Sequence, residues 1–253
     1  MELSSEEVLI KIVWENSSEG WIGKLVTADE NGLRGRKLVP GTAVSFELTD
    51  SRRCTGYNDG EDGLTPCPKW KMVEQGQQCY VCRQRDADRD YIEGRSGKMR
   101  EGEHSVYLAQ CGERVKVGVT RTNRLWKRWI EQGAVYASEI ESGLSADEAL
   151  QREQHISSNG IRERIAKREK LPTPNECFLR EVMDDFGVGG DILQPQQKTI
   201  YQSCECRTLI ESGRCVGKLE SAIGQVIQLS GTCIPVFSGR VIAPPKQAGL
   251  NDF

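Results

Sequence analysis

The chain has 253 residues, a net charge of −3 and few aromatic residues. Because domains commonly contain roughly 100–150 residues, this length predicts two or three small domains and not one large core. The near balance of charges excludes a globally basic coat protein for nucleic acid. Any affinity for nucleic acid must therefore come from a local basic patch.

No apolar run in the sequence approaches the roughly 18 residues that a membrane-spanning helix needs. The first residues also lack the basic and apolar stretches of a signal peptide. We therefore expect a cytoplasmic protein without a membrane partner, and we expect its ten cysteines to be reduced. The sequence leaves the oligomeric state open.

The N-terminal region, residues 1–53, alternates apolar and polar residues in three runs. Breaks that contain glycine and asparagine separate these runs, which is typical of antiparallel strands. We expect strands at residues 8–14, 20–26 and 42–48. A structural role and a docking role are both compatible with this region, because nothing in it indicates a chemistry.

A cysteine-rich segment follows at residues 54–100, and its polar composition cannot bury much apolar surface. Four thiolates, Cys54, Cys67, Cys79 and Cys82, predict structural Zn²⁺, because four sulfur ligands leave no open coordination position. The Cys79-x-x-Cys82 pair has a common spacing, whereas twelve residues separate Cys54 from Cys67. Free thiols and a redox Cys-x-x-Cys pair are the alternatives.

The middle region, residues 101–187, predicts a hairpin followed by two helices. Runs rich in β-branched residues at 105–109 and 114–120 flank a turn that contains a glycine, which indicates a β-hairpin. Gly133 is placed to end the first helix. Ser145 and Glu148 form a capping box that begins the second.

One carboxylate of the second predicted helix is unusual, because Glu153 falls on its apolar stripe. Spacings of three and four residues place it with Ala146, Ala149, Leu150 and Ile156. An unpaired carboxylate on such a face costs several kcal/mol, so Glu153 needs a cation, a hydrogen-bond donor or a metal.

Basic residues gather just before Glu153 in the chain. Arg121, Arg124 and Arg128 are spaced i, i+3 and i+7, which predicts one basic edge on the first helix. We expect Arg121, Arg124 and Lys127 to contact nucleic acid, because this stretch is where an anion would bind.

Beyond the second helix, residues 161–170 predict a highly charged helix and residues 175–186 another helix. The C-terminal region, residues 188–253, contains short extended runs at 214–218, 224–229, 233–237 and 239–243. Such short strands are marginal alone, so we expect them to pair with the N-terminal strands in one discontinuous β domain. The predicted fold class is α+β.

The sequence does not decide whether a second group of cysteines binds a metal. This group consists of Cys204, Cys206, Cys215 and Cys233. Cys-x-Cys is a poor metal knuckle and the other members are widely spread. Plain thiols are the alternative.

The middle region, about residues 104–187, resembles the GIY-YIG nuclease superfamily. The resemblance rests on Ser105-Val-Tyr107, Lys116-Val-Gly118, Arg128 and Glu153. It implies a small α/β domain with a central antiparallel sheet and with tyrosine and arginine side chains on one face. The whole chain also resembles an uncharacterised prokaryotic family of unknown function with a cysteine-rich zinc segment, through its cysteines and Arg128-Trp-Ile-Glu-Gln-Gly-Ala134.

The superfamily resemblance implies a role for each matched residue. Glu153 would hold Mg²⁺ or Mn²⁺, Arg128 would neutralise the phosphate, and Tyr107 would orient or deprotonate a water. Gly118 matches the second-motif glycine. Two positions depart from the pattern: Ser105 replaces the first glycine, and Lys116 replaces the second tyrosine and could bind phosphate instead.

Each implied role has an alternative without catalysis. In these alternatives Tyr107 packs in the core, Arg128 pairs with Glu153 inside the fold, and Lys116 is a solvated strand residue. The two functional hypotheses are accordingly a metal-dependent endonuclease acting on DNA or RNA, and a non-catalytic protein on a degenerate fold that binds nucleic acid or the ribosome. A reaction on a small molecule is a third possibility, because a fold does not fix a function.

Overall fold

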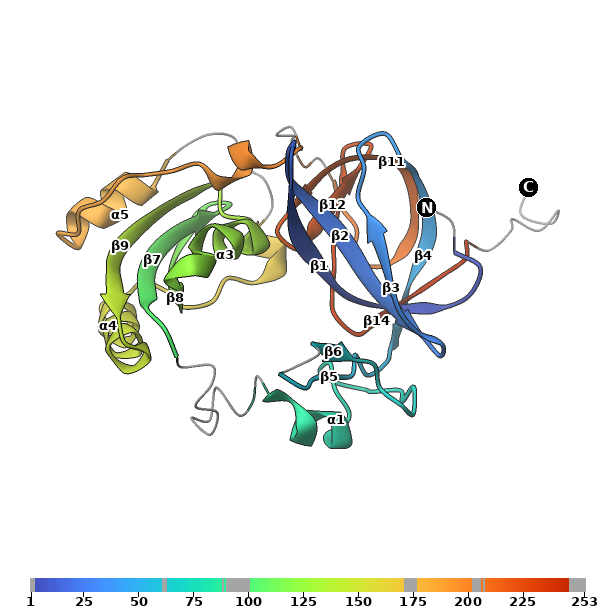
Figure 1. Cartoon of the computed structure of the whole chain (residues 1–253). Coiled ribbons are helices and arrows are strands. Elements are labelled where there is room, and N and C mark those ends of the chain that lie inside the picture. Colours follow the sequence, from blue (N-terminus) through green and yellow to red (C-terminus); the bar gives the residue numbers. More distant parts are fainter. Residues whose placement is uncertain are drawn as a thin grey trace.

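The computed structural model describes residues 3–60, 63–87, 89, 101–170, 177–201, 206 and 208–245, with residues 167 and 168 described by their backbone alone. The described strands form a nine-stranded, a three-stranded and a two-stranded sheet (Figure 1). Helices pack on the three-stranded sheet. The predicted α+β class is confirmed. None of the helices in these ranges is long and apolar enough to span a membrane.

Both ends of the chain contribute to the nine-stranded sheet, whose order is β10-β13-β12-β11-β4-β14-β1-β2-β3. The N-terminal strands are β1 (Glu7–Ser17), β2 (Gly20–Asp29), β3 (Gly32–Lys37) and β4 (Ala43–Arg52). The C-terminal strands are β10 (Thr208–Leu209), β11 (Gly213–Ile223), β12 (Val226–Leu229), β13 (Thr232–Pro235) and β14 (Arg240–Ala243). Because β4 lies between β11 and β14, the two ends interleave in one sheet, as the predicted fold class requires.

The large sheet curls around an apolar core (Figure 1). Alternating residues of its strands point inward, as the period-two pattern predicts, and include Ile12, Trp14, Phe46, Leu229 and Ile234. β3 has no such alternation, and the sequence does not predict it. A buried ion pair holds it, since Arg36 donates to the two carboxylate oxygens of Glu7 at 2.6 and 2.7 Å.

The three-stranded sheet belongs to the middle region and has the order β8-β7-β9, all antiparallel. Its strands are β7 (His104–Cys111), β8 (Arg114–Arg121) and β9 (Tyr136–Leu144). The helices α4 (Ala146–Ser158) and α5 (Leu179–Asp185) cover one face. The helix α3 (Leu125–Gln132) covers the other, after the 3₁₀ turn η2 (Thr122–Arg124). The predicted hairpin and capping box are both confirmed.

α3 packs between the two larger sheets. Trp129 lies in the core against the three-stranded sheet, and its neighbour Ile130 lies in the core of the nine-stranded sheet. Gly133 ends the helix in the left-handed conformation, with φ of 74°. A side chain at Gly133 would contact Ile223 and Gly224 of the large sheet. Both sheets therefore fix the position of α3 and of the side chains that it carries.

The helix predicted for residues 161–170 is wrong. The amide of Val117 in β8 donates to the carbonyl of Arg162 at 3.0 Å, and Arg162 forms a parallel bridge with Lys116. Only residues Lys167–Lys170 are helical, as the 3₁₀ turn η3. We call residues 161–170 the edge segment. Its backbone pairs with the unpaired backbone groups at the edge of β8, and this tertiary pairing overrides its helical propensity.

The cysteine-rich segment lies beside the lower end of the large sheet in Figure 1. It contains a short hairpin, β5 (Tyr57–Asn58) with β6 (Leu64–Thr65), and the helix α1 (Tyr80–Arg85). The Val73 amide donates to the carbonyl of Arg52, the last residue of β4, at 3.1 Å, which ties the segment to the large sheet. A further 3₁₀ turn, η4 (Pro195–Lys198), leads back from the middle region toward the large sheet.

Candidate functional site

Tyr107 lies at the centre of the sheet face that α3 covers. In the hairpin it pairs with Gly118, and a Cβ atom at Gly118 would overlap its phenol ring. The ring is fully buried and meets Trp129 edge to face, with 6.3 Å between ring centroids. A glycine is therefore required at position 118 so that the ring can cross the neighbouring strand.

The Tyr107 hydroxyl points toward α3. Gln132 Nε2 donates a hydrogen bond of 2.8 Å to it, and the guanidinium of Arg128 acts on it electrostatically. Burial raises the pKa of Tyr107 to about 12, although Arg128 and Gln132 favour the phenolate. The hydroxyl is therefore protonated at neutral pH.

Lys116 lies on the same face as Tyr107 and is only 7 % exposed. Its ammonium group donates a hydrogen bond of 2.6 Å to the carbonyl of Glu163 in the edge segment. Burial lowers the pKa of Lys116 to about 8, assisted by Lys170 and Arg128, while Glu153 opposes this shift. Lys116 is thus a buried cation and not a solvated strand residue.

Arg128 reaches this face from α3 with 46 % of its side chain exposed. Its ion pair is with Glu131 at 3.9 Å, and Glu131 also pairs with Arg124 at 3.8 Å. The pairing with Glu153 that the sequence left open is therefore not the contact that Arg128 makes. The predicted edge of three helical arginines is wrong, because Arg121 ends β8 and only Arg124 and Arg128 flank or join α3. Lys127 is half-buried on α3.

Glu153 is half-buried on α4, among the predicted apolar positions. The capping box at Ser145 fixes where this helix begins. It thereby fixes the position of Glu153 along the helix beside β8. Burial raises the pKa of Glu153, and nearby Glu163 acts in the same direction. Lys116 and Arg128 favour its charged form, as does the backbone of Val119.

The structure therefore brings four of the expected residues into one interacting group. Tyr107 comes from β7, Lys116 from β8, Arg128 from α3 and Glu153 from α4. Gln132 and Lys170 also act on this group, and sequence reasoning missed both. The position of Gln132 could have been predicted from the sequence, since it lies one helical turn after Arg128 on the same face of the helix. No sequence pattern indicates Lys170.

The four cysteines of the predicted zinc site form a second candidate site. Their sulfur atoms all lie within 4.8 Å of one another, and all four residues are buried. The β5–β6 hairpin folds back between Cys54 and Cys67, which explains how twelve intervening residues are compatible with one cluster. This tetrad could hold a structural metal such as zinc.

Backbone amides partly offset the burial of the tetrad. Burial raises the pKa of the Cys54 thiol, and two amides oppose this shift. The amides of Cys79 and Gly56 donate to the sulfur of Cys54 at 3.1 and 3.4 Å. Burial opposes ionisation of Cys79, but hydrogen bonds from Cys82 and the neighbouring sulfurs lower the pKa of Cys79 to about 7. A thiolate is the form that binds a metal.

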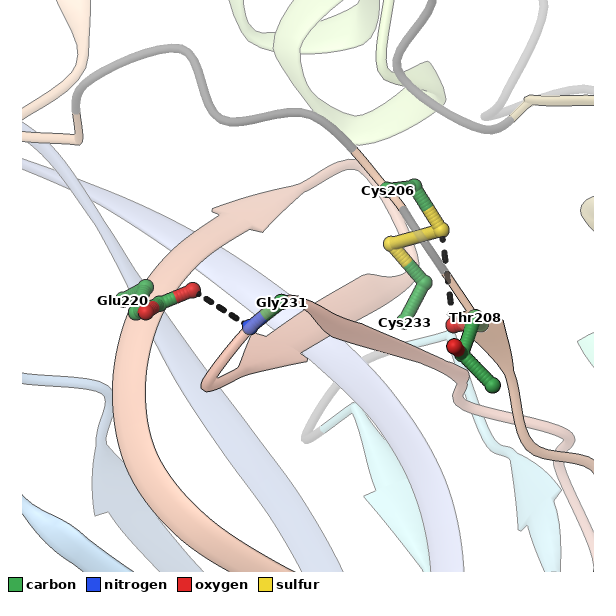
Figure 2. The surroundings of a disulfide bond; sticks show 5 residues. All are labelled: Cys206, Thr208, Glu220, Gly231 and Cys233. Atoms are coloured by element: carbon green, nitrogen blue, oxygen red, sulfur yellow. Dashed lines mark hydrogen bonds between the residues drawn. A yellow bond between two sulfur atoms is a disulfide. The ribbon is translucent and has the colours of Figure 1, made fainter.

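The described members of the second cysteine group do not form a metal tetrad. Cys206 and Cys233 are joined as a disulfide, which corrects the expectation that all cysteines are reduced (Figure 2). The bond connects the chain before β10 to β13, beside the turn where the Gly231 amide donates to Glu220. Cys215 is buried separately in the large core, and Cys204 lies outside the described residues.

Comparisons with known proteins identify a family without a biochemical assignment. Residues 41–182 match the family described as "Protein of unknown function (DUF2797)". This match spans more than half of the chain, so the chain belongs to that family. No curated protein and no solved structure matches.

The tetrad predicts bound metal in the purified protein. We expect about one equivalent of zinc per chain, bound by the four thiolates, and Cys82→Ser should lose it because three sulfurs bind zinc less tightly. Elemental analysis of protein purified under reducing conditions checks this. Cys177→Ser, outside the tetrad, is the control and should keep its metal; absence of metal from the wild type would contradict the assignment.

The burial of Lys116 predicts a pH-dependent stability. Its folded pKa of about 8 lies below the ordinary value of 10.5, so between these values the unfolded state binds more protons. The stability of the wild type relative to Lys116→Met should therefore rise with pH across this window, by up to about 3 kcal/mol. Urea denaturation of both proteins from pH 7.5 to 10.5 measures the difference; a constant difference would show that Lys116 is not held as a buried ammonium.

Proposed function

We propose that this member of the DUF2797 family is a metal-dependent phosphodiesterase that acts on nucleic acid through its middle region. The observation that carries the proposal is the electrostatic interaction of Lys116 with Arg128 and Glu153, which come from three elements. Arg128 also acts on the buried phenol of Tyr107, whereas Glu153 comes from α4, which covers the opposite face of the sheet. Cations beside one half-buried carboxylate suit a phosphate and a divalent metal.

The arrangement of elements supports the GIY-YIG resemblance. A hairpin comes first, a helix with the arginine follows, and a third strand then leads to the helix with the glutamate. The first strand is central in the order β8-β7-β9, so Tyr107 faces Gly118 across the hairpin. The two motif strands thereby place their side chains on the face that α3 covers.

In this proposal Lys116 and Arg128 bind the phosphate. Both carry positive charge at neutral pH, and the partial exposure of Arg128 leaves its guanidinium accessible to a ligand. Their charge would stabilise the extra negative charge that develops when water attacks phosphorus and the bond to the leaving sugar oxygen breaks. The attacking water would release one proton to solvent, and the leaving oxygen would take up one proton from solvent, so that protons balance.

Glu153 is the residue that would hold Mg²⁺ or Mn²⁺. Its carboxylate is half-buried, and burial raises its pKa although Lys116 and Arg128 oppose the shift. A single carboxylate fits Mg²⁺, which is usually bound by one or two carboxylates, waters and phosphate oxygens of the substrate. Bound there, the metal would supply Lewis acidity and activate water.

Tyr107 is assigned a positioning role. Its hydroxyl is buried and its pKa is raised to about 12, which disfavours deprotonation of a water by the phenolate. Through the hydroxyl it instead orients Gln132 and Arg128 of α3. Arg124, Lys127 and Arg121 extend the basic surface beside the site, where they would contact neighbouring phosphates.

The second candidate function is nucleic-acid or ribosome binding without cleavage. The burial of the Tyr107 hydroxyl and the hydrogen bond of Lys116 to the edge segment favour it, because both groups are engaged within the fold. In either case the cysteine-rich segment, with zinc as its proposed metal, has a structural role.

Replacement of Glu153 separates the two functions. Glu153→Gln should abolish Mg²⁺- or Mn²⁺-dependent cleavage of DNA or RNA, with a loss of at least about 100-fold, because the amide no longer supplies a charged metal ligand. Binding of uncleaved oligonucleotide should remain. Gel assays of labelled DNA and RNA, together with fluorescence anisotropy, measure both properties.

Glu181→Gln on the exposed surface of α5 is the matched control and should cleave like the wild type. If the wild type binds an oligonucleotide with steep salt dependence but cuts none with either metal, the non-catalytic function is correct. If it neither binds nor cuts, both candidate functions fail.

A further inference from the structure

The edge segment is fastened to the candidate site at three points. The Val117 amide donates to the Arg162 carbonyl, and the Lys116 ammonium donates to the Glu163 carbonyl at 2.6 Å. Ser157, near the end of α4, donates to the carboxylate of Glu163 at 2.8 Å. The segment is therefore joined to both β8 and α4, the elements that carry Lys116 and Glu153.

Ile165 anchors the middle of the edge segment in the core. It is 7 % exposed and belongs to the apolar cluster of Tyr107, Cys111 and Trp129. This burial fixes the path of the chain beyond it, so that the η3 turn follows close to the face of Tyr107. The Glu169 carboxylate also accepts a hydrogen bond from the Ala166 amide at 3.0 Å, which closes the turn.

The edge segment ends with a third cation beside Lys116 and Arg128. Lys170 is half-buried and acts electrostatically on Lys116, and Arg128 acts on both lysines. In the described part of the chain, neither lysine has a carboxylate within 4.0 Å. Three cations from β8, α3 and η3 thus repel one another.

We propose that Lys116, Arg128 and Lys170 form an anion-binding site that takes one phosphate group of a nucleic-acid backbone, with Lys170 as a ligand supplied by the edge segment. The identification of the phosphate as part of nucleic acid rests on the proposed function. The anion site itself rests on the packing of the edge segment and on the three cations.

A phosphate suits this site better than a carboxylate. Its tetrahedral group offers several acceptor oxygens to donors that approach from different elements, whereas a carboxylate offers two in one plane. Glu153 lies beside Lys116 and offsets only part of the positive charge there. An additional anion would relieve the remaining repulsion between the cations.

Oligonucleotide binding to the full chain tests the role of Lys170. Fluorescence anisotropy with labelled DNA and RNA, in EDTA to prevent cleavage, is measured over a range of NaCl concentrations. Lys170→Gln should weaken binding about tenfold and reduce the salt slope by about one, because one phosphate contact is lost. Lys170→Arg keeps the charge and should restore most of the affinity.

Lys218→Gln is the matched control, because Lys218 is an exposed lysine on β11 in the other sheet. It should bind like the wild type. If Lys170→Gln binds with the affinity and salt slope of the wild type, the site does not include Lys170 and the inference is wrong, while the proposed function stands.

If the wild type binds no oligonucleotide, the proposed function fails, and inorganic phosphate is then used to test the anion site alone. Sodium phosphate should raise the melting temperature of the wild type more than sodium chloride of equal ionic strength, and Lys170→Gln should lose this difference. If Lys170→Gln does not fold, NMR of the wild type replaces it. Phosphate should then shift the amides of Lys116, Arg128 and Lys170 together; no phosphate-specific effect in either measurement overturns the anion site.

Discussion

The side chain of Tyr107 crosses the backbone of Gly118, and the candidate site depends on this contact. The absence of a side chain at Gly118 leaves room for the phenol end of the Tyr107 ring, whose hydroxyl then reaches α3. Its hydroxyl then meets Gln132 and Arg128, while the strand alternation places Lys116 on the same face. A larger residue at position 118 would displace the ring and, with it, the support of Arg128.

The remaining structure holds this face in place. α3 is fixed from both sides because Trp129 packs on the small sheet and Ile130 packs in the large one. The large sheet in turn needs both ends of the chain, since β4 lies between two C-terminal strands. The cysteine-rich segment connects these parts in sequence and is tied to the large sheet by the hydrogen bond from Val73 to Arg52. The nine-stranded sheet thus acts as a support for the middle region.

Features set by local sequence were predictable. The hairpin with Gly112 at its turn, the capping box at Ser145 and the apolar stripe around Glu153 follow from spacing and from turn chemistry. Features set by distant contacts were not. The edge segment pairs with β8 although its sequence favours a helix, and β3 is held by the buried partner of Arg36. The disulfide of Cys206 and the approach of Lys170 depend on positions that no local pattern specifies.

In the proposed function, Lys116 and Arg128 bind the backbone of nucleic acid beside a metal held by Glu153. A crystal structure of the full chain with Mn²⁺ and an oligonucleotide whose phosphates resist hydrolysis tests this arrangement. We predict an anomalous Mn²⁺ peak at the Glu153 carboxylate and one phosphate within hydrogen-bond distance of Arg128 and Lys116. An oligonucleotide bound elsewhere, with no metal at Glu153, would contradict the assignment.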